Sequence, residues 1–198
     1  MHNPYLYLEK KEYAETWING GKIPIRLASC YRKDERNGIY TTDENIISSF
    51  PVPTRSWEWV LQKKGNAKDG GNIDTIISIH PFTGDKIEMK WSDGYILSFC
   101  TIKCSKVMQK LDKKICVQIN DIFKLKKCID EQMNCIGEYQ RCKYTKTHQR
   151  NHFLKSKDDE WQQEYRIFWK GIKHCPRKGF HKEFWVDIPK NTARICKL

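Results

Sequence analysis

Residues 159–169 read DEWQQEYRIFW, and the last six positions have the pattern of a β-strand. Aromatic and branched side chains dominate residues 164–169, and charged side chains stand at alternate positions. Side chains two positions apart on a strand point to the same side, so we expect Glu164 and Arg166 to lie together. Such a pair is either a surface ion pair on an edge strand, which contributes little stability, or part of a functional site.

The rest of the chain predicts more strands than helices, in an order that is not a regular alternation of the two. Further strands are expected at residues 4–9, 22–32, 72–80, 86–91, 95–102, 114–120, 137–147 and 183–189, with a hairpin turn at 92–94. Helices are expected at residues 10–19, 57–62 and 122–133, and in part of 148–163, whereas residues 32–45 and 65–72 are expected to form loops. We therefore predict a single α+β domain, residues 1–198, built on mainly antiparallel sheets.

Two of these helices have clear end signals. Asn19-Gly20-Gly21 predicts the stop of the first helix. Asp121 is placed to cap the helix at 122–133, in which an apolar stripe recurs at helical spacing. The stripe consists of Ile122, Leu125, Ile129 and Met133.

The charge of the chain indicates its partners. The 36 Lys and Arg residues outnumber the 24 Asp and Glu residues, which gives a formal net charge of +12. A positive charge of this size attracts polyanions, so nucleic acid is the first partner to expect and an anionic membrane surface the second. No apolar run approaches the roughly 20 residues of a membrane-spanning helix, and the first residues lack a signal-peptide pattern. We expect a cytoplasmic protein without membrane insertion.

The nine cysteines follow no regular disulfide framework, which favours free thiols in a reducing cytosol. Cys135, Cys142, His148 and His152 are the residues that come nearest to a zinc pattern. The two cysteines are too far apart in sequence for a zinc knuckle, and basic residues crowd the segment. We therefore expect buried or idle thiols and no metal.

The familiar short catalytic motifs are missing from the sequence, including the Walker loop, the GxSxG elbow, HExxH and the Rossmann glycine pattern. Instead, polar side chains stand on or beside predicted strands. They are Tyr5, Tyr7, Arg26, Tyr31, Arg32, Ser98 and Glu164.

The order of these residues resembles a known group of families. A Y-x-Y strand at 5–7 leads into a helix ending in NGGKI, followed by SCYRKDER, then ILSFC at 96–100 and finally W-Q-x-E-Y-R at 161–166. This order is similar to bacterial families distantly related to ADP-ribosyltransferases, including toxins of phage-defence toxin–antitoxin systems. The resemblance covers most of the chain through short motifs. It implies a split β-sheet fold that holds NAD between two sheets, a neutralising antitoxin partner, and a catalytic glutamate at the start of a late strand, which Glu164 matches.

The resemblance gives each candidate a role that its chemistry can fill. Cleaving the bond between nicotinamide and ribose develops an oxocarbenium-like cation, which a fixed carboxylate at Glu164 would stabilise. Arg32 is the first choice to hold the NAD pyrophosphate and Arg26 the second, because guanidinium groups bind phosphate through paired N–H bonds. Tyr31 and Tyr7 are expected to contact the nicotinamide ring, and Ser98 stands for the middle-strand position of the family.

The sequence departs from the family pattern in places. Many members carry His, Arg or Tyr at the first-strand position and Ser-Thr-Ser or Tyr on a middle strand, whereas here the first strand offers tyrosines and the middle strand offers only Ser98. Transferases that modify arginine carry a second acid two positions before the glutamate, and here position 162 is Gln. This difference argues against arginine as acceptor. It leaves open an asparagine-like, thymidine-like or adenine-like acceptor, or another group of a nucleic acid.

The basic segment at 141–157, RCKYTKTHQRNHFLKSK, alternates cations with aromatic rings. This pattern suits single-stranded nucleic acid, whose bases stack on rings and whose phosphates pair with cations. We select Lys143, Tyr144, Lys146 and Arg150 as contacts, with RNA expected first and single-stranded DNA second. The alternatives are a solvated basic face for the segment and, for the protein, a non-catalytic or nuclease-like nucleic-acid-binding function. No cluster of acids supports a two-metal nuclease.

Overall fold

The computed structural model describes residues 3–32, 46–51, 78–79, 86–90, 94–146, 151–170 and 182–198. These residues form a mixed α+β structure in which nearly all strand pairs are antiparallel, so the predicted class is confirmed. The strands are β1 Tyr5–Leu8, β2 Gly21–Leu27, β3 Ile46–Pro51, β4 Ser78–Ile79, β5 Lys86–Lys90, β6 Gly94–Cys100, β7 Ile115–Ile119, β8 Glu138–Arg141, β9 Lys143–Thr145, β10 Leu154–Ser156, β11 Glu164–Lys170, β12 Glu183–Ile188 and β13 Ala193–Cys196. The helices are α1 Lys11–Asn19, α3 Ser105–Lys110 and α4 Ile122–Met133, and the 3₁₀ turns are η1 Ala28–Arg32 and η3 Lys157–Gln162.

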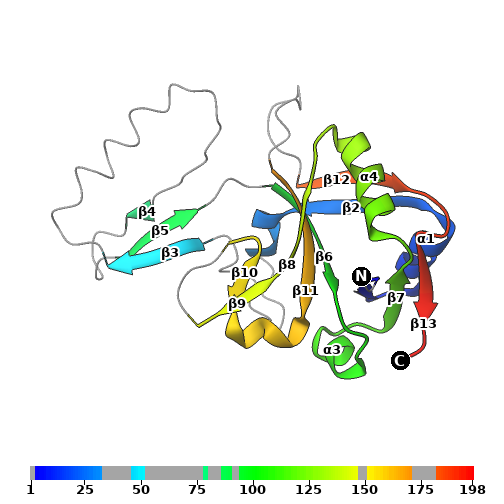
Figure 1. Cartoon of the computed structure of the whole chain (residues 1–198), viewed down its shortest axis with the longest axis horizontal. Coiled ribbons are helices and arrows are strands. Elements are labelled where there is room, and N and C mark those ends of the chain that lie inside the picture. Colours follow the sequence, from blue (N-terminus) through cyan, green and yellow to red (C-terminus); the bar gives the residue numbers. More distant parts are fainter. Residues whose placement is uncertain are drawn as a thin grey trace.

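The main sheet has eight strands and branches at β6. Strand β11 pairs along the whole of one edge of β6, and β8 pairs with the far edge of β11. The other edge of β6 is shared, since β2 pairs at Tyr95 and Ile96 and β1 pairs at Cys100. From this point β2 continues to β12, while β1 continues to β7 and β13, and Figure 1 shows these two arms running in different directions. Strands β9 and β10 form a parallel pair, and β3, β5 and β4 form a third sheet.

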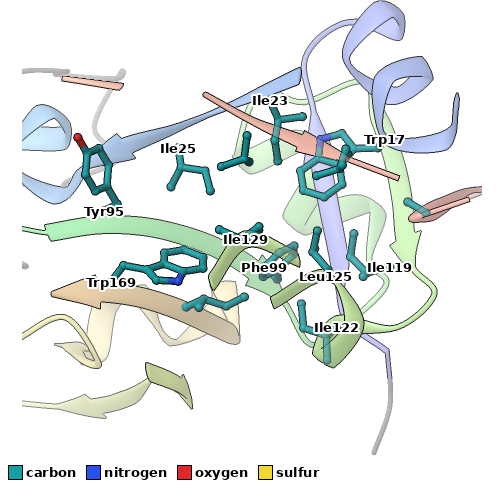
Figure 2. Packing of buried hydrophobic residues seen from close by; sticks show 14 of the residues in the cluster. Trp17, Ile23, Ile25, Tyr95, Phe99, Ile119, Ile122, Leu125, Ile129 and Trp169 are labelled. Atoms are coloured by element: carbon teal, nitrogen blue, oxygen red, sulfur yellow. The ribbon is translucent and has the colours of Figure 1, made fainter. Parts of the chain in front are cut away.

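One face of the main sheet holds the hydrophobic core. Side chains of β2, β6, β7, β11 and β12 alternate so that every second one enters this core, as the twofold period of a strand requires. Helices α1 and α4 cover this face, with Trp17 of α1 edge-on to Phe99 of β6. Figure 2 shows these rings among the isoleucines of the sheet and of α4, with Trp169 of β11 in the same layer.

Helix α4 is placed as the sequence predicts. The Asp121 Oδ1 atom accepts hydrogen bonds from the backbone N–H groups of Phe123 and Lys124, which satisfies donors that have no partner within the helix. All four residues of the predicted apolar stripe are buried in the core.

Helix α1 also ends at the predicted glycine. Gly20 has φ of +82°, and a Cβ atom there would lie 2.9 Å from the backbone nitrogen of Lys190. The chain turns sharply into β2 at this point because glycine alone tolerates both the angle and the contact.

Several sequence predictions need correction. The hairpin at 92–94 is wrong, because β5 pairs with β3 and β4 while β6 pairs in the main sheet. Strand β13 and helix α3 were not predicted, and residues 28–32 form the η1 turn rather than continuing a strand. Apart from Arg32, which ends η1, the predicted loop at 32–45 lies outside the described residues. So do the predicted loop at 65–72, the predicted helix at 57–62 and most of the predicted strand at 72–80.

The second face of the main sheet carries polar side chains between two small apolar clusters. One cluster joins Tyr7 and Cys116 to α3 and to Trp161 of η3. The other joins Ile96 and Phe168 to the η1 turn. The candidate functional residues lie on this face.

Candidate functional site

The strand register brings several predicted site residues onto one face of the sheet. Arg26 of β2 stands opposite Ile96 of β6, and Ser98 of β6 stands opposite Arg166 of β11. Residues directly opposite each other in an antiparallel pair point to the same side, and so do residues two apart on one strand. Arg26, Ser98, Glu164 and Arg166 therefore share the second face, although they are spread over more than half of the chain.

Glu164 is held there by a buried arginine. The Nε and Nη2 atoms of Arg166 lie 2.8 Å and 2.7 Å from Oε2 of Glu164, a double contact that holds this oxygen. The Arg166 side chain is 3% exposed and that of Glu164 is 12% exposed. The interpretation as a surface ion pair on an edge strand is therefore wrong, because the pair is buried and β11 lies between β6 and β8.

A second cation lies on the other carboxylate oxygen. The Nζ atom of Lys155 is 3.4 Å from Oε1 of Glu164, and the Lys155 side chain is 0% exposed. The same Nζ donates to Oε1 of Gln162 at 2.5 Å, and the Gln162 amide donates to Oδ1 of Asp159 at 3.1 Å. A buried ammonium group requires such partners, because burial of an unpaired charge is strongly unfavourable.

The backbone of Glu164 is fixed as firmly as its side chain. Its N–H group donates to the hydroxyl of Tyr144 at 2.9 Å, and its carbonyl accepts from the N–H group of Cys142 at 2.9 Å. The preceding residue, Gln163, is left-handed with φ of +46°, and its carbonyl accepts from the N–H group of Thr101 at 2.7 Å. Contacts from both flanking strands thus determine where the carboxylate points.

Lys155, Glu164 and Arg166 together form the carboxylate cluster. Two buried thiols border it, with Sγ of Cys142 3.9 Å from Oε2 of Glu164 and Cys100 directly opposite Glu164 in the register. Burial, and then the nearby carboxylate of Glu164, raise the pKa of the Cys100 thiol. The thiol of Cys100 is therefore neutral near pH 7 and is a poor nucleophile.

A carboxylate group has about four positions at which it can accept hydrogen bonds. Arg166 occupies two of them on Oε2, and Lys155 approaches Oε1 at the longer distance. Among the described residues, Lys155 is the one cation placed on Oε1, and the Glu164 side chain as a whole is 12% exposed. The arrangement can therefore orient a negative charge and present it to a bound molecule.

The other residues predicted for NAD lie in different settings. Tyr7 is buried, its hydroxyl donates to the carbonyl of Ile102 at 2.7 Å and accepts from the N–H group of Cys104 at 2.8 Å, and burial raises its pKa. Its ring belongs to the cluster with α3, which leaves it a structural role in this conformation. Tyr31 is half-buried and packs against the cluster that contains Phe168.

Two arginines were predicted to hold phosphate. Arg26 forms an ion pair with Glu183 across β2 and β12, with 2.9 Å between Nε and Oε1. Arg32 is the last residue of η1, and its side chain lies outside the described part of the structure. Ser98 is half-buried on the second face, opposite Arg166.

The residues predicted to contact nucleic acid differ in their exposure. Lys143 and Lys146 are exposed. Tyr144 is half-buried with its hydroxyl bonded to Glu164, and burial raises its pKa to about 12, so it supports the carboxylate cluster rather than offering a free ring. Arg150 lies outside the described residues.

Sequence reasoning missed Lys155. It lies in the charged stretch KSKDDE, where every lysine looks solvent-exposed, and the three-residue strand β10 is too short to show alternation. Its burial arises from the parallel pairing of β10 with β9, 11 residues earlier in the chain, and from the packing of η3, and neither has a local sequence signal.

Within the described residues, no group of three or more His, Cys, Asp or Glu side chains could hold a metal ion. Cys135, one of the residues nearest to a zinc pattern, instead donates to the carbonyl of Lys170 at 3.6 Å. In the same part of the chain, no helix is long and apolar enough to cross a membrane. Comparison with protein-family models, curated proteins and solved structures finds no match to this chain.

Proposed function

We propose that this protein is an NAD-dependent ADP-ribosyltransferase that transfers ADP-ribose to nucleic acid, with Glu164 as its catalytic residue. The observation that carries the proposal is a nearly buried carboxylate at the first residue of an interior strand, oriented by Arg166 and Lys155. Such orientation by fixed neighbours is what electrostatic stabilisation of a transition state needs.

The carboxylate would act on the ribose of NAD. Its Oε1 atom would take a hydrogen bond from the 2′-hydroxyl, and its charge would stabilise the oxocarbenium-like cation that forms as nicotinamide leaves. The acceptor group then attacks the anomeric carbon and loses a proton, which Glu164 could help to remove. Arg166 and Lys155 are positioning residues in this scheme because they contact the carboxylate and not the reacting atoms.

The branching of the main sheet supports the same proposal. The two arms leave β6 on either side of Leu97, Ser98 and Phe99, so the sheet divides at the strand that faces β11. A divided sheet with NAD between its parts is what the family resemblance implies. Tyr31 is the better placed of the two ring candidates, and Arg26 would have to exchange its Glu183 partner for phosphate.

Gln162 bears on the acceptor. Its side chain is an amide, which cannot act as the second carboxylate that arginine-modifying transferases use, and it is held instead by Lys155 and Asp159. Together with the net charge of +12, this favours a nucleic-acid acceptor, with RNA first and single-stranded DNA second.

The test is transfer of label from NAD. Purified wild-type protein, Glu164→Gln and the control Glu131→Gln are incubated with NAD labelled in its ADP-ribose part, in separate samples of RNA, single-stranded DNA and lysate protein. Glu131 is an exposed residue of α4 and serves as a matched loss of one charge. We expect label in one polymer with wild type and control, and at least a 100-fold loss in Glu164→Gln. Circular dichroism melts show whether each variant is folded.

The ion pairs of Glu164 are also compatible with a second function, nucleic-acid binding without catalysis. Glu164 pairs with two buried cations, and this structural role alone accounts for its position in a nucleic-acid-binding protein without catalysis. NAD raises the melting temperature only if the folded protein binds it. Absence of both transfer and NAD stabilisation would select this second function.

A toxin role adds one expectation to the first function. Expression of the wild type in bacteria should stop growth, while folded Glu164→Gln should be tolerated at the same protein level. The antitoxin would be a protein whose co-expression restores growth. Equal growth with both variants would refute the toxin role without bearing on transfer in vitro.

A further inference from the structure

A pocket of about 370 Å³ opens beside the carboxylate cluster, between β8, β11 and the segment 151–154. Figure 1 shows β9 and β10 next to β8 and β11 in this region. The volume is within the range of small-ligand sites and admits one unstacked base but not a duplex. Its described lining combines aromatic rings with basic side chains. Of the nucleic-acid contacts predicted from the sequence, Lys143 is among these lining residues.

The apolar part of the pocket is a group of rings. The rings of His152 and Phe168 are stacked, with 3.7 Å between centroids and 20° between planes. Phe153 stands edge-on to Phe168 at 6.4 Å and 88° and is itself only partly buried. His152 and Phe168 are buried, so Phe153 is the ring of this group that offers accessible surface. Fixed rings of this kind are the platforms on which proteins stack single bases, whatever the base.

The rim is basic. Arg141, Lys143 and Lys170 line the pocket and are exposed, whereas Glu138 is the one carboxylate among the lining residues that the structure describes. Three positive charges and one negative charge leave a net charge of +2 at the opening. The Nη2 atom of Arg141 donates to Oε1 of Gln163 at 2.6 Å, which holds this cation at the rim. Such an opening attracts phosphate.

The pocket connects to the candidate catalytic residue through Arg166. Its Nη1 atom donates to the carbonyl of His152 at 3.0 Å, while its other nitrogens hold Glu164. Phe168 lies four residues after Glu164 on the same face of β11, which is roughly 13 Å along the strand. A nucleotide in the pocket would therefore be a neighbour of the nucleotide presented to Glu164, not the acceptor itself.

We propose that this pocket binds one nucleotide of a single-stranded nucleic acid that flanks the acceptor. The base packs on Phe153, which the buried ring of Phe168 supports edge-on. Its phosphate pairs with Lys143, Lys170 and Arg141. The flanking position rests on the proposed transferase function, whereas the binding itself needs neither NAD nor catalysis.

Binding is measured without NAD, by fluorescence anisotropy of a labelled 12-nucleotide single-stranded RNA. The background is Glu164→Gln, so that no transfer can occur. The pocket variant is Lys143→Gln with Lys170→Gln, and the matched control is Lys124→Gln with Lys127→Gln, two exposed lysines of α4. Each affinity is measured at several salt concentrations.

We expect the pocket variant to bind at least tenfold more weakly than its background. The slope of log K against log salt should fall by about 1.4, because each phosphate contact to a single strand contributes about 0.7. The control pair should retain affinity within twofold. Phe153→Leu, which keeps an apolar side chain but removes the ring, should weaken binding about fivefold or more with an unchanged slope.

Equal losses in the pocket and control variants, or duplex RNA bound as tightly as the single strand, would overturn the proposal. Melting curves check that variants are folded, and the lysine variants decide the matter if Phe153→Leu is not. The two hypotheses can fail separately. Pocket-dependent binding without transfer by the wild type refutes only the transferase, and transfer without pocket-dependent binding refutes only the pocket.

Discussion

Truncating Glu164 should strongly destabilise the folded protein. Glu164→Ala leaves the ammonium group of Lys155, which is 0% exposed, and the guanidinium group of Arg166, which is 3% exposed, without their carboxylate. Removing one partner of a buried ion pair typically costs about 3–5 kcal/mol, because the remaining charge cannot return to water. For a chain of this length, that loss lowers the melting temperature by roughly 6–20 °C.

Further variants distinguish the loss of the carboxylate charge from the loss of the side chain. Glu164→Gln keeps an oxygen acceptor for Arg166 and should lose less stability than Glu164→Ala. Combining Glu164→Gln with Lys155→Met removes the carboxylate charge together with one of its two buried cations, so the double variant should be more stable than the sum of the single losses predicts. Glu15→Ala is the control, since its pair with Lys11 is exposed and should contribute less than about 0.5 kcal/mol.

Urea denaturation followed by tryptophan fluorescence gives the free energy of unfolding of each variant, with the m-value as a check that the same transition is compared. A Glu164→Ala protein within about 1 kcal/mol of the wild type would refute the reasoning. A more stable Glu164→Ala would show instead that Glu164 is held under strain, as active-site residues sometimes are.

Three further predictions concern other parts of the fold. Asp121→Ala removes the cap of α4 and should cost about 1 kcal/mol in urea denaturation, with Asp121→Asn close to wild type. Gly137→Ala should lower the melting temperature, because its Cβ would lie 2.6 Å from Nε1 of the fully buried Trp169; an unchanged melting temperature would contradict this packing. Burial raises the pKa of the Cys116 thiol to about 12 and that of Tyr144 to about 12, from 9.0 and 10.0. Both keep their protons in the folded state while the unfolded chain loses them, so stability should be constant below about pH 9 and fall as the pH rises toward 12, by up to about 1.4 kcal/mol per pH unit for Cys116. Constant stability from pH 9 to 11, measured in reductant, would exclude such shifts.

Elements with strong local signals could be predicted from the sequence. Helix α4 combines an Asp at its start with four apolar residues at helical spacing, and both features appear in the structure. Strand β11 and the common side of Glu164 and Arg166 follow from the twofold period alone.

Features that depend on distant segments could not be predicted. The residues at 92–94 predict a change of chain direction, but they do not determine which strand pairs with β5. In the structure β5 pairs with β3 and β4. Strand β13 has four residues, and its outer Ile195 is exposed, so no alternating pattern marks it. The burial of Lys155 depends on nearer segments, since β9 lies only 11 residues before it, but their strands are too short to carry a sequence pattern.

The two faces of β11 differ in what they contribute to the free energy of folding. On the core face, Tyr165, Ile167 and Trp169 gain stability from burial without any charge to compensate. On the other face, Glu164 and Arg166 must be desolvated, and Lys155 with them, at a cost that their attraction only partly offsets. Apolar residues of similar volume would serve a purely structural purpose at least as well. A polar cluster at the start of an interior strand, next to a basic pocket with aromatic walls, therefore fits the proposed ligand site better than a purely structural role.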